Sequence, residues 1–216
     1  MRNILTLFEK AIEIGLPWLG AVSGLGTLAY AITSMLLAQR RPTGQQIGAA
    51  RKVLRTPYLV IATILFIALA YWLWKPLPLH LSGMVQIFLT LLGAIIMLPN
   101  LALYVWGLRT LGSNFNASSG FGVRLVQAHQ LITYGPFAYL RHPMYLAVIL
   151  ACWGGLLLYR TWAMLLFAVM MFGLLYRGHR EEEALAQAFE SEWELYKQAV
   201  PGWFPRLKGV SRRDSH

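Results

Sequence analysis

The chain has 216 residues, of which 57% are hydrophobic and only 13% are charged. A soluble domain usually carries about a quarter charged residues, so this composition excludes an ordinary soluble protein. The formal net charge is +10, but basic residues that flank membrane spans account for it better than a nucleic-acid partner does. One cysteine, Cys152, and five scattered histidines support neither a disulfide scaffold nor a metal site.

Five apolar segments follow one another along the chain, each near or just under the roughly 20 residues that a membrane-spanning helix needs. They cover about residues 14–38, 58–74, 82–108, 143–159 and 162–176. Only Arg160 and Thr161 separate the last two, which predicts a tight helical hairpin. We therefore expect an all-α integral membrane protein with about five transmembrane helices, in which residues 1–216 form a single membrane domain.

The basic residues lie mainly on one side of these predicted spans. Fifteen lysines and arginines fall between the first and second spans, between the third and fourth, or after the fifth, and four fall on the other side. The positive-inside rule then predicts an N-terminus outside and a C-terminus in the cytoplasm. The membrane would be the bacterial inner membrane, or the endoplasmic reticulum if the source is eukaryotic.

The connection between the third and fourth spans, residues 112–142, is rich in glycine, serine and asparagine. Connections of this length in a compact protein are either functional or disordered, and the interleaved large apolar residues argue against disorder. We expect a folded cap at the cytoplasmic mouth of the bundle. It ends in the run Arg141-His142-Pro143-Met144-Tyr145, where the proline predicts a helix start. A plain helix start with an interfacial Arg and Tyr also explains this run.

A second polar cluster follows the fifth span. Arg177 and Glu181 share one face if the helix continues beyond the membrane, and a simple surface ion pair between them is the alternative to a ligand site. Residues 180–200 repeat large apolar side chains at spacings of three and four. This pattern predicts a C-terminal amphipathic helix, along the membrane surface or under the bundle, that stops at Pro201.

The two clusters together resemble the isoprenylcysteine carboxyl methyltransferase family of membrane enzymes, over residues 114–205. The first part of the resemblance consists of HQLIT at 129–133, GPF at 135–137 and RHPMY at 141–145. After a hairpin of two spans, the second part consists of Arg177, Glu181 and the apolar tail that ends in Val200-Pro201. The order of the two parts around a hairpin makes the resemblance more specific than either motif alone.

The resemblance implies a cytoplasmic pocket for S-adenosyl-L-methionine, and a lipidic or prenylated substrate that enters from the bilayer. It implies no metal. The cofactor-binding residues would be His129, Gln130, Leu131, Ile132, Phe137, His142, Pro143, Met144, Tyr145 and Glu181. Glu181 would pair with the amino group of the cofactor. Arg177 would be the catalytic residue and face an isoprenylcysteine-type carboxylate. Phe137 stands where the family usually has tyrosine, so the hydrogen bond of that tyrosine is expected to be missing.

Three alternatives stay open at this point. The acceptor could instead be a phospholipid amine. An NADPH-dependent reductase of the membrane sterol-reductase type shares an RHPxY-like segment, but it is expected to carry an Arg-Asp pair followed by Cys where this chain has Glu181, Glu182 and Glu183. A non-catalytic membrane scaffold would leave the polar connection and the Arg177–Glu181 spacing without a task.

Overall fold

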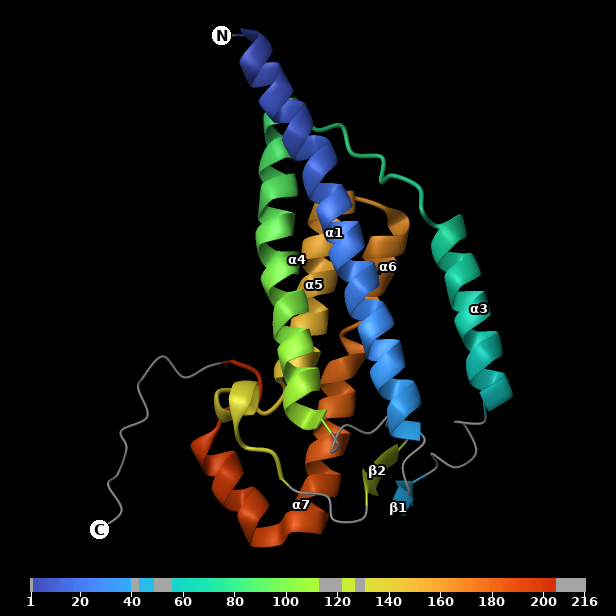
Figure 1. Ribbon diagram of the computed structural model, residues 1–216, viewed down its shortest axis with the longest axis vertical. Helices are drawn as coiled ribbons and strands as arrows, with labels where there is room; N and C mark the ends of the chain where they lie inside the picture. Colours follow the sequence, from blue (N-terminus) through green and yellow to red (C-terminus); the bar gives the residue numbers. More distant parts are fainter. Residues whose placement is uncertain (1, 40–42, 49–55, 113–121, 127–130, 205–216) are drawn as a thin grey trace, which may run out of the picture.

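The computed structural model describes residues 2–39, 43–48, 56–112, 122–126 and 131–204. Over these residues the chain is a bundle of long helices, with the described parts of the predicted cap, residues 122–126 and 131–142, at one end (Figure 1). The helices are α1 (Arg2–Gln39), α3 (Thr56–Trp72), α4 (Gly83–Leu111), α5 (Pro143–Tyr159), α6 (Trp162–Met170) and α7 (Gly173–Ala199). The predicted helical membrane fold with a C-terminal amphipathic helix is confirmed.

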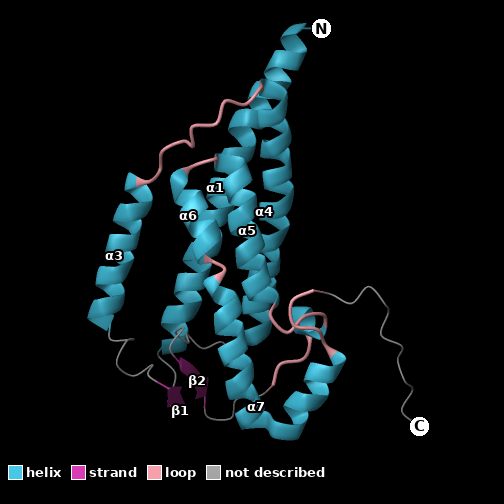
Figure 2. Cartoon of the chain, turned by 180° about the vertical axis from the view of Figure 1, so that it is seen from behind, coloured by secondary structure: helices cyan, strands magenta, loops and turns pink. Residues whose placement is uncertain are grey.

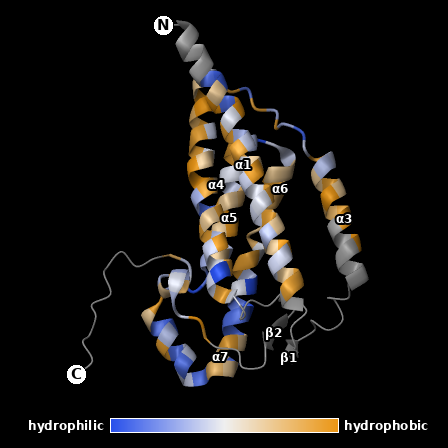
Figure 3. Cartoon of the chain, in the orientation of Figure 1, coloured by the Kyte–Doolittle hydropathy of each residue, from blue (hydrophilic) through white to orange (hydrophobic). Residues whose placement is uncertain are grey.

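The apolar lengths of these helices suit a bilayer. Among the described residues, three stretches are long and apolar enough to cross one: Glu9–Leu37, Gly83–Leu111 and Trp162–Ala199. The helices α3 and α5 have 17 residues each, which at about 1.5 Å per residue approaches the thickness of a hydrocarbon core. Figure 3 shows hydrophobic residues over much of the bundle and hydrophilic ones gathered on α7. The exposed apolar side chains of α1 and α3 therefore face lipid.

The fifth apolar segment differs from the sequence prediction. Instead of one span to residue 176, helix α6 ends at Met170, and α7 begins at Gly173 and runs on through the amphipathic region to Ala199. Within α7 the backbone turns sharply at Glu190, which has φ 42°. The far part of α7 therefore folds back toward the cap (Figure 2).

A small two-stranded ribbon was not predicted. Strand β1 (Thr43–Gly48) pairs antiparallel with β2 (Gly122–Val126), with Ile47 opposite Val123. It joins the connection after α1 to the long connection after α4. The ribbon lies at the end of the bundle where α7 bends (Figure 1).

The predicted hairpin between the last two spans is present. Arg160 adopts the left-handed conformation that ends α5, and the Thr161 hydroxyl accepts a hydrogen bond from the Met164 amide to cap α6. The Arg160 guanidinium donates to the Thr90 hydroxyl at 3.1 Å, which fixes the turn to α4.

Helices α4 and α5 form the centre of the bundle because two glycines let their backbones touch. A Cβ atom on Gly154 would lie 2.6 Å from the Met97 amide nitrogen and 2.8 Å from the Gly93 carbonyl oxygen. A Cβ atom on Gly93 would meet the backbone of Gly154 and Leu158 in the same way. Small residues allow this close approach, which drives helix association where lipid supplies no hydrophobic force.

Gly154→Val is therefore expected to separate α4 from α5 and lower the free energy of unfolding by at least about 1–3 kcal/mol, the range of overpacked cores. Thermal unfolding in detergent measures this. Gly15→Val is the matched control, because no atom lies within 4 Å of its added Cβ. Equal melting temperatures for the two variants would contradict the close packing.

Candidate functional site

The cap is placed on the bundle by a short turn. The 3-10 helix η2 (Gly135–Ala138) lies against the end of α4, where Gly135 has φ 63° and its Cβ position lies 2.7 Å from the Thr110 hydroxyl. Its turn leads into α5, which has Pro143 at its first position. His142, just before it, makes no side-chain cap, so its ring is available for contacts with α7.

The first predicted cluster lies where α5 and α7 meet. The Tyr145 hydroxyl donates a hydrogen bond to Glu181 Oε2 at 2.7 Å and accepts one from Arg177 Nε at 3.0 Å. The Arg177 guanidinium also lies over the Tyr145 ring, 5.5 Å from its centroid. The structure thus brings together three predicted site residues from two helices. An anionic and a cationic side chain lie on either side of one hydroxyl.

A second cluster beside it involves Glu182, which sequence reasoning missed. Glu182 Oε1 accepts hydrogen bonds from Arg141 Nε at 2.9 Å and His142 Nε2 at 2.8 Å, and it forms a salt bridge with Arg141 Nη2 at 2.9 Å. A carboxylate can only accept, so His142 carries its proton on Nε2. The run Arg141-His142 is therefore tied directly to α7. We call Arg141, His142 and Glu182 the clamp.

The clamp also holds the end of the described chain. Arg141 Nη1 donates to the carbonyl oxygens of Val200 at 2.6 Å and Lys197 at 3.1 Å. The amides of Arg141 and His142 donate to the carbonyls of Pro201 and Gly202. These bonds place the Trp203 ring against the His142 ring, with centroids 4.8 Å apart. A Cβ atom on Gly178 would lie 2.8 Å from Trp203, so only glycine lets the indole close in on α7.

The electrostatics of the clamp follow from these contacts. Burial alone would raise the pKa of Glu182, but the hydrogen bonds from His142 and Arg141 and the Arg141 charge outweigh it and lower the pKa to about 2. Glu182 is therefore ionised at any physiological pH. Its side chain is only 17% exposed, and that of His142 only 4%. The clamp is a nearly buried ionic contact.

The remaining predicted residues have different surroundings. Pro143 is fully buried, Ile132 is buried, and Met144 packs against Gly107 of α4, so Met144 faces the bundle core. Leu131 packs beside the cluster of Trp193, Tyr196 and Val200. Phe137 is half-buried, and its carbonyl oxygen accepts a hydrogen bond from the Tyr196 hydroxyl at 2.7 Å. His129 and Gln130 lie outside the described residues.

The side chains where α5 and α7 meet suit a zwitterionic cofactor that carries an aromatic base. Glu181 offers a carboxylate to an ammonium group, and Tyr145, which bonds it, lies in a row of stacked rings with His142 and Trp203. Trp193 Nε1 is buried without a hydrogen-bond partner among the described residues. No group of three potential metal ligands occurs in the described part of the chain. The residues present thus fit S-adenosylmethionine.

Part of the chain is similar to known proteins. Residues 91–187 match the model of the Isoprenylcysteine carboxyl methyltransferase (ICMT) family. A solved structure of the eukaryotic intramembrane Ras methyltransferase ICMT, determined without a monobody, is similar at 21% sequence identity and a TM-score of 0.46. That similarity covers 70% of this chain and 53% of the solved one, so the chain spans about half the length of that relative. No curated protein matches the chain.

Proposed function

We propose that this chain, whose residues 91–187 match the model of the isoprenylcysteine carboxyl methyltransferase family, transfers a methyl group from S-adenosyl-L-methionine to a lipidic acceptor in the membrane. The observation that carries the proposal is the Arg177–Tyr145–Glu181 arrangement, in which two opposite charges flank one hydroxyl at the start of α5. Such an arrangement can hold two ligands of opposite charge side by side.

Methyl transfer requires the protein mainly to align the methyl donor with the acceptor. When bound, the cofactor supplies a sulfonium methyl group that is already electrophilic. The residues of this chain then have to hold donor and acceptor in line and exclude water. Glu181 would bind the amino group of the cofactor, while His142, Tyr145 and Trp203 would cover it. Leu131, Ile132 and Phe137, with His129 and Gln130, would lie along its adenosine part.

Arg177 would face the acceptor. A carboxylate acceptor is ionised at neutral pH and needs no general base, but it needs a counter-charge at the membrane boundary. We therefore propose O-methylation of an isoprenylcysteine-type carboxylate, in a single membrane domain with the C-terminus in the cytoplasm. Fifteen of the nineteen lysines and arginines on the proposed cytoplasmic side support this orientation.

Glu181→Ala is expected to weaken S-adenosylmethionine binding at least tenfold, because a charge-assisted hydrogen bond contributes about 1.5–3 kcal/mol. Calorimetry on the purified protein in detergent measures it. Glu183→Ala is the matched control: Glu183 is two residues on, 45% exposed, and pairs with Arg180. Equal affinities for the two variants would remove Glu181 from the cofactor site.

The same preparation separates the other functions. Binding of NADPH in place of S-adenosylmethionine would indicate a reductase, and binding of neither would indicate a scaffold. With the cofactor bound, radiolabelled methyl transfer to a prenylated cysteine carboxylate or to phosphatidylethanolamine identifies the acceptor. Transfer to the amine alone would overturn the ester-forming reaction but not the methyltransferase.

A further inference from the structure

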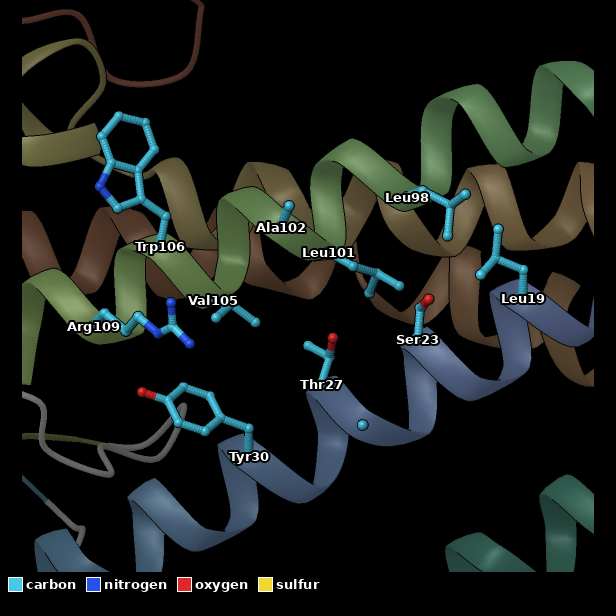
Figure 4. Close-up of a pocket in the computed structure, with 11 residues that line it drawn as sticks. Leu19, Ser23, Thr27, Tyr30, Leu98, Leu101, Ala102, Val105, Trp106 and Arg109 are labelled. Atoms are coloured by element: carbon cyan, nitrogen blue, oxygen red, sulfur yellow. The ribbon is translucent and has the colours of Figure 1, made fainter. Parts of the chain in front are cut away.

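A groove between α1 and α4 lies apart from the residues discussed above. It has a volume of about 710 Å³, within the range of ligand sites, which is about 300–1,000 Å³. Its walls are Leu19, Ser23, Gly26, Thr27 and Tyr30 from α1, and Leu98, Leu101, Ala102, Val105, Trp106 and Arg109 from α4 (Figure 4). It therefore presents a mostly apolar trough to the surrounding bilayer.

The groove exists because α1 touches the bundle at one level and leaves it at another. A Cβ atom on Gly20 would lie 2.7 Å from Leu158, and the Tyr159 hydroxyl bonds the Pro17 carbonyl at 2.7 Å, so the helices are in contact there. Two turns on, no atom lies within 4 Å of a Cβ on Gly26. Figure 1 shows α1 diverging from α4 toward the end that carries the cap.

The chemistry of the groove is graded along its length. Leu19 and Leu98 line the end away from the cap, and the end nearest the cap holds Tyr30 and Arg109, with the guanidinium 5.9 Å from the Tyr30 ring centroid (Figure 4). Trp106, 48% exposed, lies one turn before the arginine. None of the described residues that line the groove is acidic. An apolar trough that ends in an exposed cation is complementary to an amphiphile with an anionic headgroup.

The groove is separate from the methyl-transfer site. On α4, Gly107 faces Met144 of α5, whereas the groove is lined by residues at positions 98, 101, 102, 105, 106 and 109, which share the other side of the helix. No residue of the clamp, and none of Tyr145, Arg177 and Glu181, lines it. A ligand in the groove would therefore contact α1 and α4 without reaching the proposed cofactor.

We propose that this groove is a binding site for one anionic phospholipid of the surrounding bilayer, with an acyl chain along the leucines and its phosphate at Arg109. The lipid fills the space that α1 leaves open and so fastens α1 to α4. One basic residue near a membrane surface contributes about 1 kcal/mol to the binding of anionic lipid, which corresponds to roughly fivefold higher affinity.

The full-length protein, purified in detergent and incubated with phosphatidylglycerol or phosphatidylcholine, tests this by native mass spectrometry and thermal unfolding. The wild type is expected to retain phosphatidylglycerol roughly fivefold better and to melt at a higher temperature with it. Arg109→Gln should abolish the preference. Gly26→Leu, which fills the trough where an added Cβ meets nothing, should reduce binding of both lipids.

Two matched variants serve as controls for this experiment. Lys75→Gln removes a cation that also lies over an aromatic ring, that of Trp72, but outside the groove. Gly15→Leu adds a side chain at an equally open glycine of α1 outside the groove. Both should bind like the wild type. An unchanged preference in Arg109→Gln, or competition by a prenylated cysteine carboxylate that shows the groove to be the acceptor's site, overturns the proposal. S-adenosylmethionine binding should persist in Arg109→Gln, so the two proposals can fail separately.

Discussion

Replacing Glu182 by alanine is expected to loosen the cap and to weaken S-adenosylmethionine binding more than tenfold, although Glu182 bonds Arg141 and His142 and not the proposed ligand. The substitution leaves Arg141 and His142 nearly buried without their shared acceptor. Loss of hydrogen bonds to a charged group costs about 2–3 kcal/mol, or roughly 5–10 °C in melting temperature for a chain of this size. Residues 200–203 and the Trp203 ring, which Arg141 and His142 hold, should be released.

The pH dependence of unfolding distinguishes this ionic role from simple packing. The pKa of Glu182 is lowered from its usual value of 4.5 to about 2 in the folded protein. Its contribution to stability is therefore complete above about pH 4.5 and is lost as the pH falls toward about 2. The difference in melting temperature between wild type and Glu182→Ala should be constant near neutrality and should shrink between about pH 4.5 and pH 3.

Glu183→Ala is the control here too, because Glu183 is adjacent in sequence and largely exposed. It should change neither the melting temperature nor the affinity appreciably. If the difference in melting temperature between wild type and Glu182→Ala did not change with pH, the Glu182 side chain would stabilise the cap by its volume and not by its charge. Undiminished cofactor affinity in a destabilised Glu182→Ala would separate the clamp from the ligand site.

The local parts of this structure could be predicted from sequence. Apolar length and the positions of Pro143 and of the Arg160-Thr161 turn determine where α5 begins and the hairpin lies, since these signals act within one helical turn. The spacing of Arg177 and Glu181 likewise determines that both lie on one face of α7. These predictions needed no knowledge of what the helices pack against.

The clamp could not be predicted, because its partners are about forty residues apart in the chain. Three consecutive glutamates, 181 to 183, look alike in sequence, yet the structure gives one to Tyr145, one to Arg141 and His142, and one to the surface. Which glutamate faces which partner depends on how α7 is rotated against α5. The bend at Glu190 has no sequence signal either, because a non-glycine residue there adopts a positive φ.

Arg177→Ala is expected to lower methyl transfer about 10²–10³-fold, the typical effect of removing one electrostatic contact to a reacting group. The affinity for S-adenosylmethionine should change little, because Tyr145 and Glu181 keep their own hydrogen bond of 2.7 Å. Arg177→Lys should restore part of the activity, since an ammonium supplies the charge but not the two parallel bonds of a guanidinium. Turnover and calorimetry on the same preparations separate the two effects.

Arg180→Ala is the matched control for this prediction, because Arg180 lies three residues further along α7, is 59% exposed and pairs with Glu183 at 3.1 Å. It should turn over like the wild type. If Arg177→Ala also kept full turnover, the arginine would only orient Tyr145, and the acceptor's counter-charge would have to come from another residue. If it instead lost cofactor affinity in step with activity, Arg177 would belong to the cofactor site. A selective loss of turnover is therefore the result that assigns Arg177 to the acceptor.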